Sequence, residues 1–221
     1  MNEHNIKNKD KQLFIDTWKI KCLNSVLIEW NEVLLTYLKK TQYSDCQWEY
    51  NERAILSSFA AAVWLNDNIA LEEYSSERKG KHGRKYSGRC DLYFKTGKHD
   101  FNCEAKKITC GIGGKSKKSN TIDLVKSGLK EAYHEAKRKI PKDAGRRLGM
   151  CFVVPRLPKA EIKNKDNHII DFQENIKNNK EKIGYSSIAM IFPEKTRKQD
   201  KEEQHHYPGI VLLIKEVKLQ V

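Results

Sequence analysis

The sequence predicts an α/β fold in which helices flank a mixed β-sheet. Two kinds of apolar pattern alternate along its 221 residues. Steps of three and four residues are typical of helices, and short alternating or continuous apolar runs are typical of strands. In chain order, these patterns predict a helix, a strand, a hairpin, a helix, a strand, a short helix and two strands. We divide the chain into an N-terminal arm with an amphipathic helix (1–45) and a sheet-containing domain (46–221).

The N-terminal segment is expected to be mostly helical. Residues 1–11 are polar and predict a loose arm, whereas 13–39 carry one continuous apolar stripe at helical spacing. Such a stripe can cover the core of its own domain or form a dimer surface. Packing on its own core is the commoner use of an amphipathic stripe.

A second helix is expected over 51–65, where Asn51 is suited to cap the N-terminus. Glu52 lies on the same stripe as the apolar residues that follow it. A carboxylate facing a core needs a partner, because burying an unpaired charge is costly. A metal ion or Lys106 can serve as that partner. Alternatively, Glu52 is a first-turn acid that the helix dipole favours.

The segment from Gly88 to Lys106 predicts a hairpin, after a first strand over 69–74. Two strands fold about Gly97-Lys98, so cross-strand partners have positions that sum to 195. Asp91 then lies directly opposite Glu104. Opposite side chains of an antiparallel pair have Cβ atoms about 4.5–5.5 Å apart, which is close enough for two carboxylates to share one metal ion.

The same register sorts the hairpin residues by face, since successive side chains point to opposite sides of a strand. One face is apolar and can pack on a core: Leu92, Phe94, Phe101, Cys103 and Ala105. The other is polar: Asp91, Tyr93, Asn102, Glu104 and Lys106. An acid opposite an acid destabilises an ordinary sheet, so this pairing indicates a function. The alternative is an ordinary half-exposed hairpin.

The remaining elements follow from simpler patterns. A helix is expected over 121–140, a short helix over 168–178, and strands over 148–154, 188–192 and 210–214. Loops are expected at 155–167 and 194–206.

Two basic loops flank the part of the hairpin that carries Asp91 and Glu104. Segments 76–87 and 111–120 both contain glycine and several cations, which suits a ligand made of phosphates. The candidate nucleic-acid contacts are Lys79, Lys81, Arg84, Lys85, Arg89, Lys115, Lys117 and Lys118. Gly111-Ile112-Gly113-Gly114 resembles a phosphate-binding loop but lacks the Walker spacing, so no ATP site is predicted.

Composition is consistent with a nucleic-acid-binding protein. The formal net charge is +13, and a strongly basic protein is favoured by a polyanion such as nucleic acid. The six cysteines have no C-x-x-C spacing, which argues against a zinc ribbon. The chain opens on a polar segment and has no apolar run of membrane-spanning length, so we expect a cytoplasmic protein that does not enter a membrane.

Gly88-Arg89-x-Asp91-Leu92, a short hairpin and then Glu104-Ala105-Lys106 resemble the signature of the PD-(D/E)XK nuclease superfamily, which has the restriction-endonuclease-like fold. The resemblance covers roughly 52–133, and Cys90 stands where the family has a proline. It implies a Mg²⁺-dependent deoxyribonuclease in which Asp91, Glu104, Lys106 and Glu52 are catalytic. It also implies a setting in restriction, phage defence or mobile-element biology.

The residues named by this resemblance suit a hard cation. Mg²⁺ prefers oxygen ligands and keeps several waters, and Mn²⁺ can substitute for it. The carboxylates of Asp91 and Glu104 and the backbone carbonyl of Ala105, the last carried over from the resemblance, give three oxygens. Lys106 can hold the attacking water or offset charge in the transition state, and the neighbouring carboxylates argue against its being the general base.

Three functions compete. The first is a DNA endonuclease that acts as a homodimer or with a partner subunit, because cutting both strands usually takes two sites. The second is a non-catalytic nucleic-acid-binding or assembly subunit with a nuclease-like fold. The third is an RNA-processing enzyme. Metal binding separates the first from the second, and substrate preference separates the third.

Overall fold

The computed structural model describes residues 11–79, 84–114, 118–140, 145–196 and 204–218. The strands are β1 (Lys11–Asp16), β2 (Ile69–Lys79), β3 (Lys85–Thr96), β4 (His99–Gly111), β5 (Lys139–Ile140), β6 (Arg146–Pro158), β7 (Ser187–Pro193), β8 (His205–His206) and β9 (Ile210–Glu216). The α-helices are α1 (Asn24–Lys40), α2 (Glu52–Leu65), α3 (Lys118–Arg138), α4 (Lys165–Asn178) and α5 (Lys180–Ile183). Short 3₁₀ turns are η1 (Lys21–Leu23), η2 (Gln47–Glu49) and η4 (Lys159–Asn164).

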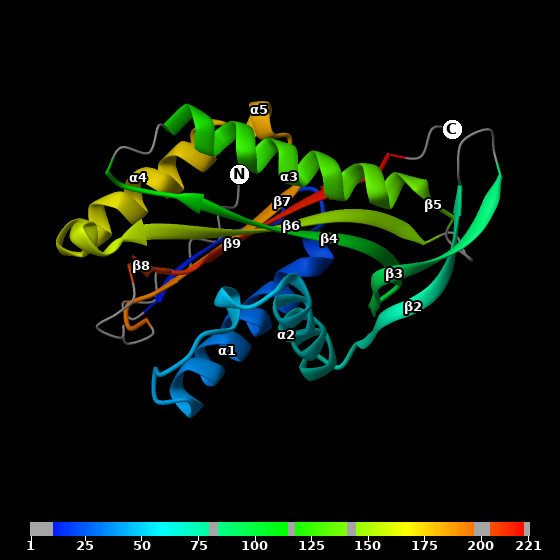
Figure 1. The fold of residues 1–221 in the computed structure, drawn as a ribbon. Coiled ribbons are helices and arrows are strands. Elements are labelled where there is room, and N and C mark those ends of the chain that lie inside the picture. Colours follow the sequence, from blue (N-terminus) through cyan, green and yellow to red (C-terminus); the bar gives the residue numbers. More distant parts are fainter. Residues whose placement is uncertain (1–10, 80–83, 115–117, 141–144, 197–203, 219–221) are drawn as a thin grey trace.

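The described strands form one mixed sheet at the centre of the protein (Figure 1). Its order is β1-β7-β9-β6-β4-β3-β2-β5, and β8 pairs with β6. Strands β4 and β6 are parallel, and β3 is antiparallel to both β2 and β4. The predicted mixed sheet flanked by helices is therefore confirmed.

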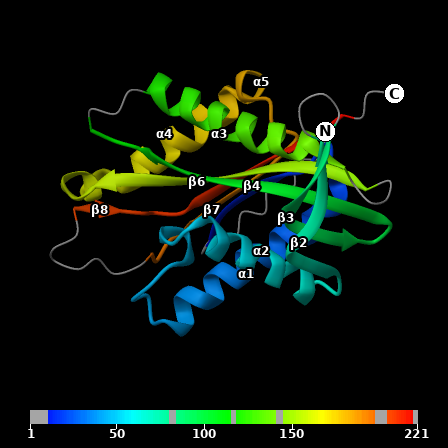
Figure 2. The same ribbon diagram turned by 45° about the vertical axis from the view of Figure 1, so that its right-hand side comes forward.

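Helices cover both faces of the sheet. Helices α1 and α2 lie on one face, and α3, α4 and α5 lie on the other, as the two views of the ribbon agree (Figure 1; Figure 2). Each layer encloses its own apolar core. In the α1/α2 core, the rings of Trp30 and Phe59 lie 6.0 Å apart and those of Phe59 and Phe94 lie 5.7 Å apart. The apolar stripe of α1 thus packs on the protein's own core.

The N-terminal helix begins later than the sequence predicts. Residues 11–16 form β1, which pairs antiparallel with β7, and α1 starts only at Asn24 after η1. The apolar run Leu13-Phe14-Ile15 suits a strand as well as a helix. As a strand it serves both cores, because Leu13 and Ile15 contact the α1/α2 core and Phe14 contacts the other.

The first basic loop is largely strand. Strand β2 continues to Lys79 and β3 begins at Lys85, with pairing from Lys79↔Lys85 through Ile69↔Lys95. Because β3 pairs with β4 only between residues 92 and 96, the outer part of β2 and β3 extends beyond β4 as an arm (Figure 1), and β5 joins it at Glu77 and Arg78. Except for Tyr86, its residues from Ser76 to Lys79 and from Lys85 to Gly88 are polar or glycine, so no apolar alternation marks it in the sequence.

Other boundaries shift less. The predicted loop 155–167 is divided among the end of β6, η4 and the start of α4, and β8 lies inside the predicted loop 194–206. The helix predicted over 121–140 begins earlier than expected, since α3 starts at Lys118. The Asn51 cap is confirmed, because its side chain accepts a hydrogen bond from the Ala54 N–H at 3.0 Å. All six cysteines are thiols.

Helix α3 lies close against β4 and β6 because two contact points carry glycine. A Cβ at Gly149 on β6 would lie 2.5 Å from the backbone nitrogen of Tyr133. A Cβ at Gly128 on α3 would lie 2.8 Å from the Ile108 side chain. These contacts fix the height and register of α3 over β4, and therefore which of its side chains can reach the residues below.

Candidate active site

The predicted hairpin register is confirmed for residues 92–96 and 99–103, and the pairing ends one position short of Asp91 and Glu104. Strands β3 and β4 pair from Leu92↔Cys103 to Thr96↔His99 around the turn at Gly97-Lys98, and every pair sums to 195. Beyond this point the two strands separate, since β3 continues along β2 and β4 continues along β6. Asp91 and Glu104 are the next positions in the register, so the two carboxylates stand where the strands part.

Two carboxylates bind the edge of β4 that β3 leaves open. The N–H of Ala105 donates to Asp91 Oδ2 at 2.8 Å, and the N–H of Lys107 donates to Glu52 Oε2 at 2.7 Å. In a strand, the N–H and C=O of one residue point to the same side. The carbonyl of Ala105 therefore also leaves the strand toward Asp91.

Glu104 is buried, with a 3% exposed fraction. Its neighbours Cys103 and Ala105 belong to the α1/α2 core, so Glu104 points to the opposite face, which α3 covers. Burial raises the pKa of the Cys103 thiol, and the charges of Cys90, Glu104 and Asp91 add to the effect. Both carboxylates therefore lie near the same buried sulfur.

Lys106 is held by a carboxylate that the sequence analysis did not identify. Its Nζ lies 3.3 Å from Glu131 Oε1 on α3. Burial lowers the pKa of Lys106, but the hydrogen bond and charge of Glu131, with the charges of Glu52 and Glu135, outweigh burial and raise the pKa above its ordinary value. Lys106 is thus an ammonium ion in this arrangement.

Glu52 reaches the same place from the first turn of α2. Burial raises the pKa of Glu52; the N–H of Lys107 and the charge of Lys106 oppose this, and the charges of Asp91 and Glu131 reinforce it. These mutual effects mean that charged groups from α2, β3, β4 and α3 share one site. Lys107 ties the segment before α2 to β4 here, because its Nζ donates to the carbonyls of Glu49 in η2 and of Tyr50.

The arrangement suits a magnesium ion with few protein ligands. In the described part of the chain, no three His, Cys, Asp or Glu side chains form a group that could hold a metal ion. Mg²⁺ is usually bound by one or two carboxylates together with waters and substrate oxygens. Asp91 and Glu104, with the Ala105 carbonyl, fit that smaller donor set, and all three donors are hard oxygens.

The candidate nucleic-acid contacts are only partly described. Arg84, Lys85 and Arg89 are exposed on the arm. The side chains of Lys79 and Lys118, and the whole of Lys81, Lys115 and Lys117, lie outside the described residues.

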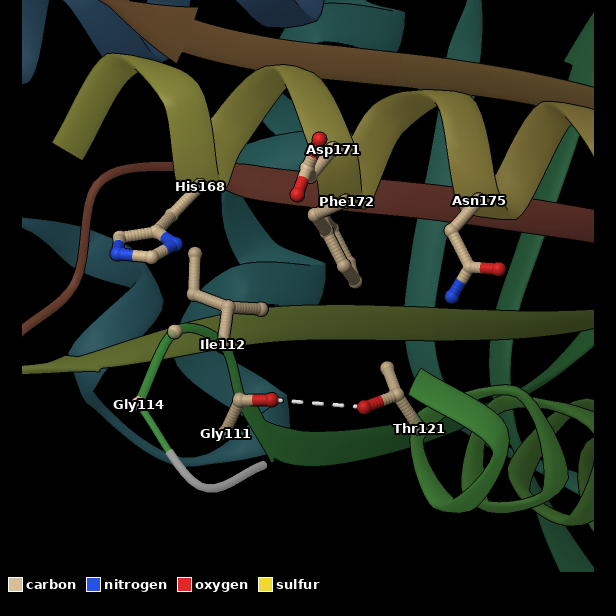
Figure 3. A pocket seen from close by; sticks show the side chains of 9 residues that line it. Gly111, Ile112, Gly114, Thr121, His168, Asp171, Phe172 and Asn175 are labelled. Carbon is tan, nitrogen blue, oxygen red and sulfur yellow. Dashed lines mark hydrogen bonds between the residues drawn. The ribbon is translucent and has the colours of Figure 1, made fainter. Parts of the chain in front are cut away.

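The glycine run at 111–114 borders a separate cavity of about 180 Å³. It lies at the carboxyl end of β4, five residues beyond Lys106 or roughly 16 Å along a strand. Figure 3 shows His168 and Asn175 of α4 facing this run, with Thr121 donating to the Gly111 carbonyl at 3.4 Å.

Sequence reasoning missed Glu131 and also Glu73 of β2, whose carboxylate contacts Arg53 and Arg89. Neither acid stands in a motif. Glu131 becomes part of the site only through the packing of α3. Glu73 could have been found from the pairing of β2 with β3, which sets it opposite Asp91.

Comparisons with protein-family models, with curated proteins and with solved structures find no match. Among the described helices, none is both long and apolar enough to cross a membrane.

Proposed function

We propose that this protein is a metal-dependent nuclease that hydrolyses phosphodiester bonds in DNA. One observation carries the proposal: Asp91 and Glu104 are the first positions beyond the last β3–β4 pair, Asp91 accepts the Ala105 N–H, and Lys106 lies beside them. Carboxylates brought together in this way need a cation to offset their repulsion. A divalent ion with a phosphate as its further ligand meets that need.

The residues have distinct roles in this proposal. Asp91, Glu104 and the Ala105 carbonyl would hold Mg²⁺, which polarises the scissile phosphate and lowers the pKa of a bound water. Lys106 offers an ammonium to the phosphate and offsets charge that develops on it. Glu131 holds that ammonium over the site at 3.3 Å. Since acids raise the pKa of Lys106, it acts as a cation and not as the general base.

The restriction-endonuclease-like fold is part of the same proposal. The succession α2, β2, β3, β4, α3 and β6 gives a helix, an antiparallel three-stranded unit, a second helix and a strand parallel to β4. This order agrees with the layout that the PD-(D/E)XK resemblance implies. We further propose a cytoplasmic role in restriction or phage defence, and action as a homodimer or with a partner subunit.

The test is incubation of the purified protein with supercoiled plasmid, linear duplex, single-stranded DNA and RNA, each in Mg²⁺, Mn²⁺ and EDTA. We expect DNA cleavage in either metal and none in EDTA. Glu104→Gln should abolish cleavage, whereas Glu174→Gln, an exposed change on α4, should not.

Other outcomes would point elsewhere. Cleavage of RNA alone would make the protein an RNA-processing enzyme. Tight, salt-sensitive binding without cleavage in any metal would instead indicate the non-catalytic binding subunit. Unchanged activity in Glu104→Gln would remove the assigned site from the mechanism.

A further inference from the structure

Glu73 of β2 binds two arginines from different elements. Its Oε1 lies 3.1 Å from Arg53 Nε on α2, and its Oε2 lies 3.3 Å from Arg89 Nε on β3. The Arg53 and Arg89 side chains are 65% and 64% exposed, against 32% for Glu73. Glu73, Arg53 and Arg89 thus form a triad in which the acid is the inner member, and the two guanidinium groups are turned outward to solvent.

The backbone of Glu73 is adapted to this contact. Its φ of 52° lies in the left-handed region, which residues with a Cβ adopt only at an energetic cost. It interrupts the ladder between the pairs Glu72↔Leu92 and Tyr74↔Cys90, so its position faces Asp91. Regular pairing is therefore interrupted at the position of β2 that faces Asp91.

Both arginines adjoin residues of the candidate site. Arg53 follows Glu52 in the first turn of α2. Arg89 precedes Asp91 by two positions on β3, so their side chains share a face and their Cα atoms lie about 6.6 Å apart. Two cations therefore stand immediately beside the carboxylates.

Charge makes this position suitable for a phosphate. The triad has two cations and one anion, a net charge of +1, whereas the carboxylates next to it repel a phosphodiester. Guanidinium groups match phosphate oxygens through paired N–H donors. A nucleic acid can approach the acidic site only if nearby cations hold its backbone.

We propose that Arg53 and Arg89 together bind one phosphate of the nucleic-acid backbone, next to the phosphate that the carboxylates address. Glu73 is the positioning residue that holds the two guanidinium groups side by side. This inference rests on the proposed function, because it assigns the substrate's neighbouring phosphate to a place beside the same site.

The test measures binding in EDTA, where the proposed nuclease cannot turn over. The affinity of a labelled DNA duplex is followed by fluorescence anisotropy over a series of KCl concentrations, for Arg53→Gln, Arg89→Gln and the double variant. One neutralised phosphate contributes about 0.9 to the slope of log affinity against log salt. Because both arginines bind the same phosphate, the double variant should lose about 0.9 in slope, and each single variant should lose less.

Two further variants exclude general electrostatics. Lys39→Gln removes the same charge at an exposed position in the last turn of α1 and should leave the slope unchanged. The double Arg→Lys variant keeps both charges but loses the planar fork, so it should recover the slope and only part of the affinity. Thermal melting of each variant confirms that it folds.

A loss of about 1.8 in slope for the double variant would mean two separate phosphates and would overturn the shared site. An equal loss of slope from Lys39→Gln would overturn it too. Wild-type protein that neither binds nor cuts nucleic acid would refute the proposed function itself. If the wild type cleaves DNA and the Arg variants bind DNA with the wild-type salt dependence, the proposed function stands and only the role of the arginine pair is refuted.

Discussion

Three of the acidic residues near the separation of β3 and β4 have specific contacts. Asp91 and Glu52 accept the N–H groups of Ala105 and Lys107, and Glu131 pairs with Lys106. Such contacts hold the side chains in place before any ligand arrives, which is what an active site requires. They also give the charges measurable effects on stability.

Glu52 should make the stability of the protein depend on pH. Burial raises the pKa of Glu52 in the folded protein. The contribution of Glu52 to the free energy of unfolding is therefore fully present below its unfolded pKa of about 4.3. That contribution is lost as pH rises through the folded pKa. Glu52→Gln keeps an acceptor for the Lys107 N–H but cannot ionise.

The free energy of unfolding of Glu52→Gln should therefore increase relative to wild type as pH rises from 4 toward 7, as measured by urea denaturation. Glu174→Gln on α4 is the control for removal of an exposed carboxylate. If the difference in free energy of unfolding between Glu52→Gln and wild type stays constant or decreases as pH rises, the burial of Glu52 would be contradicted.

Glu73 offers a matched pair of substitutions. Glu73→Gly and Glu73→Ala both remove the carboxylate, but only alanine keeps the penalty of a Cβ at φ 52°. The glycine variant should be more stable than the alanine variant by about 1 kcal/mol, measured by chemical denaturation. Equal stabilities, or a more stable alanine variant, would mean that the backbone at this position is not strained.

The packing of α3 on β4 and β6 determines which helix residues reach the site. Gly149 and Gly128 allow the close approach, and Glu131 follows Gly128 by three residues. A side chain at either glycine would push α3 away from the sheet. The Lys106–Glu131 pair therefore depends on residues that carry no charge.

Gly149→Ala should destabilise the protein by about 1–3 kcal/mol, because its Cβ would meet the backbone of α3 and not a flexible side chain. Ser127→Ala, at an exposed position of α3, should change stability by less than about 0.5 kcal/mol. Thermal or urea unfolding measures both. A neutral Gly149→Ala would show that the contact can relax.

The sequence predicts the elements near the site better than their partners. The hairpin register follows from the turn at Gly97-Lys98 and from side-chain alternation, both of which are local. The pairing of Lys106 with Glu131 is not local, since it depends on contacts between α3 and β6. The strand at 11–16 was missed for the same reason, because its pairing with β7 decides between two structures that the apolar run permits.

Across the whole molecule, a small acidic site stands within a strongly basic chain. The net charge of +13 favours any polyanion, and the exposed Arg84 and Lys85 place cations on the arm beyond Asp91. Charge alone would bind nucleic acid without cutting it. The carboxylates of Asp91 and Glu104 are what distinguish a nuclease from a binding subunit.

The most direct test of that distinction is the single-turnover rate of duplex cleavage in Mg²⁺ for wild type, Glu104→Gln and Glu174→Gln. The account predicts metal-dependent cleavage by wild type and by Glu174→Gln, and a rate at least about 100-fold lower for Glu104→Gln. Cleavage by Glu104→Gln at the wild-type rate would contradict it.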